Sequence, residues 1–214
     1  NYAYKINDGA WQTGNRVTIS DTGKYTITCS AVDIAGNRST LVTKEIWVDT
    51  SVPTTPSVET SSDFVDDEWI ACPVTLTASG SSDDYSSGAS LIYSYSINGE
   101  DFVTGNQVTI ADNGEYTIRF MTTDEAGNNS AYLVRTVHLD QTAPSIPAYS
   151  ALSNEAVYGE ATWANDSVTF TLRDSEDEGG SDLLGYEYKI NDGEWQSGSH
   201  ATISDSGKYT IEYR

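Results

Sequence analysis

The sequence predicts an all-β fold made of tandem antiparallel β-sandwiches, with about seven strands in each unit. One block of eight residues occurs three times, at Tyr4–Trp11, Tyr95–Phe102 and Tyr188–Trp195. Each copy is followed at matching spacing by an Asp-x-Gly-x-Tyr-Thr-Ile block, and no segment shows the 3.6-residue period of a helix. The copies begin 91 and then 93 residues apart, which predicts a tandem array of one small domain type.

The predicted elements begin inside a unit. Tyr2, Tyr4 and Ile6 alternate with polar neighbours, as in a half-buried strand, and Asn7-Asp8-Gly9 is a strong hairpin signal. The strands expected after this hairpin are Val17–Ile19, Lys24–Val32 and Leu41–Val48. Residues 1–49 are therefore predicted to be the C-terminal part of a unit.

Residues 50–140 are expected to form a complete unit. The strands expected there are Thr55–Thr60, Val74–Ala78, Leu91–Ile97, Phe102–Val103, Gln107–Ile110, Glu115–Thr122 and Leu133–Leu139. Residues 141–214 repeat the same order from Val168–Leu172 onward and stop before the last strand. This third segment is predicted to be the N-terminal part of another unit in a longer array, with any targeting signal or anchor outside the segment.

The charge balance limits the classes of partner. The chain has 11 basic and 32 acidic residues and a net charge of −21, which would repel nucleic acid and anionic membrane surfaces. No apolar run reaches 18 residues, so no membrane insertion is expected. Cys29 and Cys72 fall in different predicted units, which excludes a disulfide within a unit, and no CxxC motif indicates zinc or redox chemistry.

The repeated Asp-x-Gly-x-Tyr block resembles the tyrosine corner of immunoglobulin-type sandwiches, in which a Tyr hydroxyl returns to the upstream backbone. Tyr25, Tyr116 and Tyr209 occupy the tyrosine position. Together with Ala-Val-Asp-Ile-Ala-Gly-Asn, Thr-Thr-Asp-Glu-Ala-Gly-Asn and the linkers Val-Asp-Thr-Ser-Val-Pro and Leu-Asp-Gln-Thr-Ala-Pro, the chain resembles bacterial Ig-like repeats, which are similar to fibronectin type III domains. The resemblance implies a module of long surface proteins, adhesin stalks or secreted multidomain glycosidases.

No enzymatic activity is expected. The two histidines, His138 and His200, have no nucleophile at a useful spacing. Acidic pairs such as Asp83-Asp84 lie in polar loops rather than in an apolar cleft that would raise a carboxyl pKa. The sequence therefore predicts neither a catalytic residue nor an organic cofactor.

Calcium is the one candidate cofactor. In an Ig-like topology the linker between two units and the loops at one pole of the next unit lie close together, and hard cations prefer such oxygen ligands. The candidates at the first junction are Asp49, Asp83, Asp84, Asp124 and Asn128, and those at the second are Asp140, Asp174, Asp177 and Asp182. The alternative, that these are solvated acidic loops without an ion, stays open.

The aromatic residues help to distinguish a structural scaffold from a sugar-binding module. Trp11, Phe102 and Trp195 recur at one position after the hairpin, and Trp69 matches Trp163. Recurrence at a fixed position favours a filler at the edge of the core, whereas exposed rings would stack on sugars.

The expected function is structural: a stalk segment of a bacterial cell-surface, adhesin-like protein that presents a distal head. The alternative is an accessory carbohydrate-binding or spacer module of a secreted polysaccharide-degrading enzyme. The expected partners are neighbouring Ig-like repeats, with any glycan or host surface contacted through domains beyond this segment. The expected location is extracellular, at the cell surface or secreted.

Overall fold

A computed structural model describes residues 1–61, 64–86 and 90–214. The chain divides into two compact units, one comprising Asn1–Asp63, Thr75–Thr109 and Thr117–Arg135 and the other Phe64–Val74, Ile110–Tyr116 and Thr136–Arg214. The division into an N-terminal repeat (residues 1–49), a central repeat (50–140) and a third repeat (141–214) stays a prediction.

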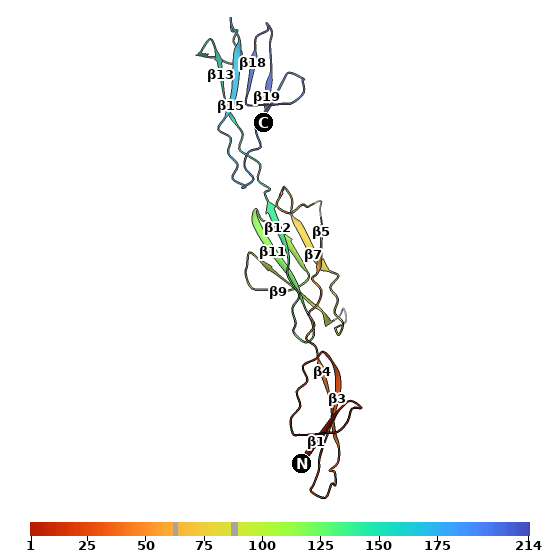
Figure 1. The fold of residues 1–214 in the computed structure, drawn as a ribbon. Helices are drawn as coiled ribbons and strands as arrows, with labels where there is room; N and C mark the ends of the chain where they lie inside the picture. Colours follow the sequence, from red (N-terminus) through yellow and green to blue (C-terminus); the bar gives the residue numbers. More distant parts are fainter. Residues whose placement is uncertain (62–63, 87–89) are drawn as a thin grey trace. The chain divides into compact units, whose positions relative to one another are not determined.

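The described residues form sheets without a helix, so the all-β prediction is confirmed. The N-terminal repeat is one four-stranded antiparallel sheet in the order β2-β1-β3-β4, whose longer strands are visible in Figure 1. Its strands are β1 (Tyr2–Ile6), β2 (Gln12–Thr13), β3 (Gly23–Ala31) and β4 (Val42–Val48).

The central repeat contributes strands to two sheets, in the orders β10-β7-β5 and β6-β12-β11-β8-β9. The strands of the first sheet are β5 (Ser57–Thr60), β7 (Val74–Ser79) and β10 (Gln107–Ile110). Those of the second are β6 (Trp69–Ile70), β8 (Ile92–Ile97), β9 (Val103–Thr104), β11 (Gly114–Thr123) and β12 (Leu133–Leu139).

The third repeat also forms two sheets, in the orders β14-β13-β15-β18 and β17-β16-β19. The strands of its first sheet are β13 (Ala148–Ser153), β14 (Ala156–Val157), β15 (Val168–Arg173) and β18 (His200–Ile203). Those of its second sheet are β16 (Glu187–Ile190), β17 (Gln196–Ser197) and β19 (Ile211–Tyr213).

The repeated hairpin carries an asparagine that fixes two elements at once. Asn7, Asn98 and Asn191 have φ of 51°, 52° and 54°, in the left-handed region that asparagine tolerates. Each side-chain Oδ1 also accepts the backbone N–H of Thr26, Thr117 or Thr210, at 2.8, 2.8 and 2.9 Å. The asparagine therefore shapes the turn and ties it to the strand region that follows the next turn.

The tyrosine of the repeated corner block closes the turn before it. Tyr25 Oη donates to the carbonyl of Asp21 at 3.0 Å, and Tyr116 Oη donates to that of Asp112 at 3.1 Å. The Tyr209 ring lies over its own turn glycine in the same way, because a Cβ built on Gly207 would lie 3.0 Å from the ring. Within the described residues Tyr209 makes no matching hydroxyl bond, and 39% of its surface is exposed.

Burial differs sharply between the repeats. Leu76 and Ala78 on β7, and Ile118 and Phe120 on β11, have no exposed surface, as expected for the inner faces of two packed sheets. In the N-terminal repeat the residue that corresponds to Phe120 is Cys29, and it is exposed. The central repeat therefore has a close-packed core, whereas the corresponding position of the first sheet is exposed.

The expected strand at Val17–Ile19 is not formed. Its counterpart in the central repeat, β10, lies beside β7 in the sheet, and the N-terminal repeat has no strand corresponding to β7 among the described residues. The alternating sequence is present at Val17–Ile19. Its backbone has no neighbouring strand among the described residues with which to form the hydrogen bonds that define a strand.

One pairing has no local sequence signal. The two-residue strand β6 pairs in parallel with β12, with His138 opposite Trp69 and Leu139 opposite Ile70. Two residues are too short for a detectable period of two, so only the tertiary structure shows this strand.

No helix in the described part of the chain is long and apolar enough to cross a membrane.

Replacing Tyr116 by Phe removes one hydroxyl from the corner of the central repeat and keeps the ring. We expect the free energy of unfolding to fall by about 1 kcal/mol, the usual net value of one hydrogen bond. Urea denaturation measures the change. Tyr132→Phe, at a 54% exposed tyrosine, is the matched control and should change stability little; equal effects of both variants would contradict the role of the corner.

Candidate metal centre

Three carboxylates predicted for calcium converge within the first compact unit. Asp49 directly follows β4, Asp83 lies in the loop after β7, and Asp124 directly follows β11. One carboxylate oxygen of each lies within 4.8 Å of the others. Asp124 is almost fully buried, at 3% exposure, and the other two are half-buried.

Local hydrogen bonds orient each of these carboxylates. Asp83 Oδ2 accepts the N–H groups of Tyr85 and Ser86, at 2.9 and 2.8 Å, and Asp49 Oδ1 accepts that of Ser51 at 3.0 Å. Each aspartate uses one carboxylate oxygen in these local bonds, and the local bonds do not involve the second oxygen of Asp49 or of Asp83. The loops therefore hold the two aspartates independently of any ion.

Asn128, the fifth residue predicted at this junction, contacts two of the three aspartates through its amide hydrogens. Its backbone N–H and its Nδ2 each donate to the Asp124 carboxylate at 2.8 Å, and Nδ2 also donates to the carbonyl of Asp49 at 3.1 Å. As a donor to Asp124, this side chain fixes the carboxylate beside the linker. Asp33 and Asn37 repeat the same pair of bonds in the N-terminal repeat, at 2.8 and 2.9 Å.

The electrostatics of Asp124 favour its charged form. Burial raises the pKa of this carboxyl, but hydrogen bonds from the Asn128 side chain, the Asn128 backbone and the amides of Gly127 and Ala126 outweigh it, so the net pKa lies below 3.8. Within the described part of the chain, none of the three carboxylates forms an ion pair. Three carboxylate oxygens that lie close together, with little positive charge nearby to balance them, are the type of ligand that a hard cation prefers.

Asp140 and Asp177 repeat part of this arrangement within the second compact unit. Asp140, 7% exposed, accepts the N–H of Thr142 at 2.9 Å, that of Ser181 at 3.2 Å and the Nδ2 of Asn113 at 3.3 Å. Bonds from Ser181 and the Thr142 backbone lower the pKa of the Asp140 carboxyl. Asp177 accepts the Ser181 hydroxyl through Oδ2, and its Oδ1 is buried without a hydrogen-bond partner among the described residues.

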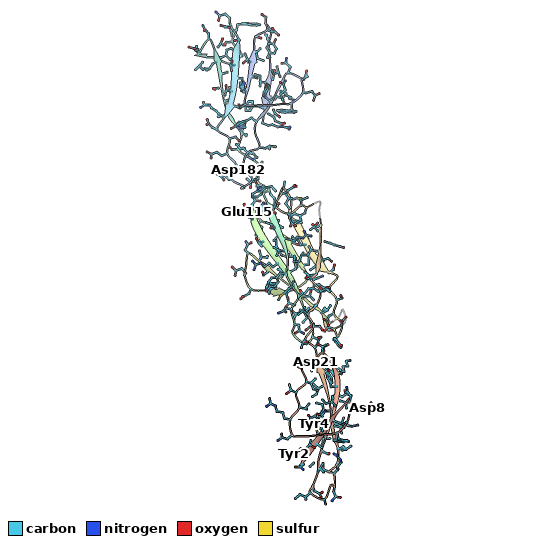
Figure 2. The ribbon with its side chains drawn as sticks, viewed as in Figure 1. Tyr2, Tyr4, Asp8, Asp21, Glu115 and Asp182 are labelled. Atoms are coloured by element: carbon cyan, nitrogen blue, oxygen red, sulfur yellow. The ribbon has the colours of Figure 1, made fainter. Side chains whose placement is uncertain are left out.

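The remaining candidates lie apart from these groups. Asp84 is exposed beside Asp83 and does not belong to the group of three. Asp174 pairs with Arg173 at 3.5 Å, on the surface. Asp182, labelled in Figure 2, is exposed and has a φ of 61°. In the described structure neither Asp174 nor Asp182 joins a group of three carboxylates.

The linkers carry polar contacts that sequence reasoning missed. Thr50 N–H donates to Thr22 Oγ1 at 3.0 Å, and Ser82 N–H donates to Thr54 Oγ1 at 2.8 Å. The second linker has corresponding bonds, from Gln141 N–H to Asn113 Oδ1 at 2.9 Å and from Glu176 N–H to Ser145 Oγ at 2.8 Å. The only sequence signal was the recurrence of small polar residues at matching positions.

Most tryptophans have a cation over the ring. Arg38 lies 4.2 Å from the Trp11 centroid, Lys24 lies 4.4 Å from Trp47, and Arg214 lies 4.3 Å from Trp195. Trp69 packs against His138 with ring centroids 5.2 Å apart. These contacts cover part of each ring, as expected for rings at the edge of a scaffold.

Trp163 differs from the expectation of a core-edge filler, because 77% of its surface is exposed and its one cation, Lys208, lies 5.9 Å away. Its counterpart Trp69 lies against β12. Among the described residues, no strand that corresponds to β12 pairs with the segment around Trp163.

The comparisons with known proteins identify the repeat. Residues 12–50 and 94–141 match the family model described as the bacterial Ig-like domain. This match confirms the resemblance to bacterial Ig-like repeats that the repeated motifs predict.

Exoglucanase B of Cellulomonas fimi is 32% identical over 230 residues, an alignment that covers 94% of this chain. The chain spans 19% of the length of that relative.

Two solved structures show distant likeness. The FN1–FN3 domains of chicken CNTN1 align with a TM-score of 0.30 and 15% identity, covering 98% of this chain and 77% of that chain. Chitinase ChiA74 from Bacillus thuringiensis aligns with a TM-score of 0.31 and 19% identity, covering 78% of this chain and 27% of that chain.

Stability should depend on pH through Asp124 and Asp140. Both pKa values are lower in the folded chain than the ordinary 3.8, so the stabilisation is complete above about pH 5 and is lost as pH falls through 3.8 toward the folded values. Urea denaturation between pH 6 and pH 3 measures it. Asp124→Asn should flatten this dependence, and an unchanged slope in that variant would contradict the assignment.

The predicted calcium site is tested by calorimetric titration and thermal melting. If the group of three binds calcium, an ion concentration about 100 times the Kd adds about 2.7 kcal/mol to the free energy of unfolding. Asp83→Asn should abolish the heat and the rise in Tm, whereas Asp84→Asn, at the exposed neighbour, should leave both unchanged. Absence of heat and of any Tm shift in the unaltered chain would support solvated acidic loops.

Proposed function

We propose that the chain is a spacer of tandem Ig-like repeats in a secreted or cell-surface bacterial protein, where it holds another domain at a distance. The main support for this proposal is that the residues repeated between the units stabilise the fold. The turn asparagine, the corner tyrosine and the Asp-x-Ala-Gly-Asn loop all make hydrogen bonds within the scaffold. The sequence common to the repeats therefore supports a common fold rather than a common ligand.

The linkers support a spacer in a second way. At both linkers, backbone N–H groups bond to hydroxyl or amide oxygens at matching positions, as Thr50 does to Thr22 and Gln141 to Asn113. Bonded linkers limit the conformations open to the connecting residues. Calcium held by Asp49, Asp83 and Asp124 would add a further restraint on the first linker.

The parent protein fits two descriptions, and both use the repeats as spacers. A secreted polysaccharide-degrading enzyme is supported by the likeness to Exoglucanase B, since the chain corresponds to about a fifth of that relative. An adhesin-like surface protein is supported by the family of bacterial Ig-like domains. Either parent would place the chain outside the cell, as a module without catalytic residues of its own.

Carbohydrate binding is the second candidate function, and the likeness to Exoglucanase B favours it. A flat aromatic ring with 77% of its surface exposed offers a stacking platform for a sugar. The more covered rings of Trp11 and Trp195 offer less. Sugar binding by this chain would therefore centre on Trp163.

Affinity electrophoresis separates the two functions. The chain is run through gels that contain hydroxyethyl cellulose, xylan or glycol chitin, with a gel without polysaccharide as the reference. A spacer should migrate alike in all of them. Retardation that Trp163→Ala abolishes and Trp11→Ala preserves would instead establish a carbohydrate-binding module.

A further inference from the structure

Two consecutive glycines of the loop after β15 pack against residues of β6 and of the end of β12, within the second compact unit. Gly179 is buried, and a Cβ built on it would collide with the carboxylate of Asp140. Gly180 has a φ of 107°, and a Cβ built on it would lie 3.3 Å from the Trp69 ring. Glycine is therefore required at the first position for space and at the second for its backbone conformation.

Hydrogen bonds hold the carboxylate that lies against Gly179. Oδ1 of Asp140 accepts the N–H of Thr142 at 2.9 Å and the Nδ2 of Asn113 at 3.3 Å, and Oδ2 accepts the N–H of Ser181 at 3.2 Å. A side chain at position 179 would push the carboxylate away from these donors, and the lost bonds would leave a 7% exposed carboxylate unsatisfied. One carboxylate therefore ties together the turn before β11, the linker and the loop at residues 174–182.

The same loop is bonded to the linker at a second place. Ser145 N–H donates to the carbonyl of Glu176 at 2.8 Å, and Glu176 N–H donates back to Ser145 Oγ at 2.8 Å. The hydroxyl of Ser175 donates to the Ser145 carbonyl. None of these bonds involves Asp140, so the exchange of the Glu176 amide reports on the loop independently of the carboxylate.

The first linker is held differently. Counted from the start of β7 and of β15, Tyr85 and Ser86 occupy the positions of the two glycines. Asp49 directly precedes the first linker, as Asp140 precedes the second, and its Oδ1 accepts the N–H of Ser51 at 3.0 Å. Among the described residues, the Asp49 side chain accepts no N–H from the loop after β7. The contact between two glycines and a carboxylate is thus a feature of the second linker.

We propose that Gly179, Gly180 and Asp140 form a lock that holds the second linker against the loop that follows β15. Gly179 and Gly180 are positioning residues, because the absence of their side chains lets the loop reach the carboxylate and the Trp69 ring. The lock deepens the spacer function proposed above and rests on it, since a closed linker limits the motion of the residues that connect successive repeats.

Hydrogen exchange of the full chain tests the lock, with the amide of Glu176 as the reporter. We expect Gly179→Ala to raise the exchange rate of this amide by at least about tenfold, because displacement of the carboxylate frees the loop. Gly159→Ala is the matched control in the same repeat, because a Cβ there would lie 3.7 Å from Thr162, an ordinary contact. It should leave the rate unchanged.

A double variant separates the loss of this contact from a general weakening of the loop. Asp140→Ala removes the acceptor of the Ser181 amide and should by itself raise the exchange rate of the Glu176 amide. Once the carboxylate is gone, an alanine at position 179 has nothing to displace. The chain with both Gly179→Ala and Asp140→Ala should therefore exchange like Asp140→Ala alone.

Faster exchange in Gly179→Ala that is absent from Gly159→Ala and does not increase further in the double variant supports the lock. The proposal is overturned if Gly179→Ala leaves the rate unchanged, if Gly159→Ala raises it equally, or if the two effects multiply in the double variant. Should Gly179→Ala fail to fold, an unchanged rate in Asp140→Ala would overturn it. Electrophoresis in polysaccharide gels tests the spacer function separately, so either proposal can fail without the other.

Discussion

The constraint on which this structure depends is that the apolar face of a β-sheet must be covered. In the central repeat, Leu76 and Ala78 from one sheet and Ile118 and Phe120 from the other are removed from water altogether. Each buried side chain of leucine size contributes about 2 kcal/mol or more, so this packing is the main source of stability for the repeat. The hydrogen-bonded turns determine which residues reach that face, and the packing makes the arrangement stable.

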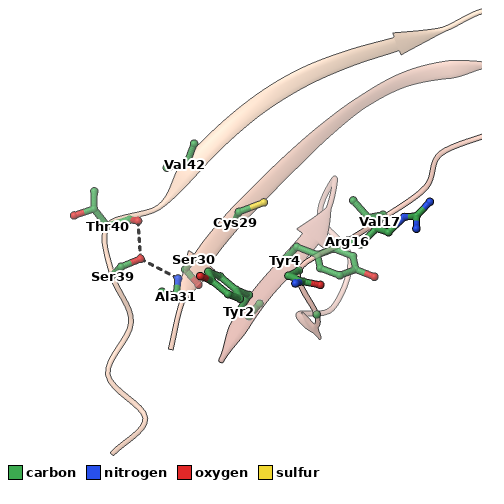
Figure 3. Close-up of a pocket in the computed structure, with 13 residues that line it drawn as sticks. Tyr2, Tyr4, Arg16, Val17, Cys29, Ser30, Ala31, Ser39, Thr40 and Val42 are labelled. Carbon is green, nitrogen blue, oxygen red and sulfur yellow. Dashed lines mark hydrogen bonds between the residues drawn. The ribbon is translucent and has the colours of Figure 1, made fainter. Parts of the chain in front are cut away.

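The N-terminal repeat has the same turns as the central repeat but exposes Cys29 at the position that Phe120 fills there (Figure 3). Its sheet keeps the register of the central repeat, and its turn asparagine and corner tyrosine make the same bonds. Without a second sheet among the described residues, Cys29 is exposed and Val17–Ile19 does not form a strand. Local chemistry is sufficient for the turns, whereas the edge of the sandwich requires a partner.

This contrast explains how much the sequence could predict. The hairpin asparagine, the corner tyrosine and the alternation along β11 and β12 are local signals, and the sandwich class follows from them. Which of two adjacent aspartates joins a carboxylate group is not a local property. Asp83 joins the group because its loop lies beside the residues that follow β4 and β11, whereas Asp84 is exposed. The pairing of β6 and the exposure of Trp163 likewise depend on strands far away in the sequence.

The cations placed over the tryptophan rings have a consequence for how unfolding can be followed. Five tryptophans are distributed along the chain, with two in the N-terminal repeat, one in the central repeat and two in the third. Trp47 has a lysine amino group above it, Trp11 and Trp195 each have a guanidinium group, and Trp69 has an imidazole ring. Each contact exists only while its own strands are paired, so indole emission provides an intrinsic optical reporter of the order in which the sheets are lost.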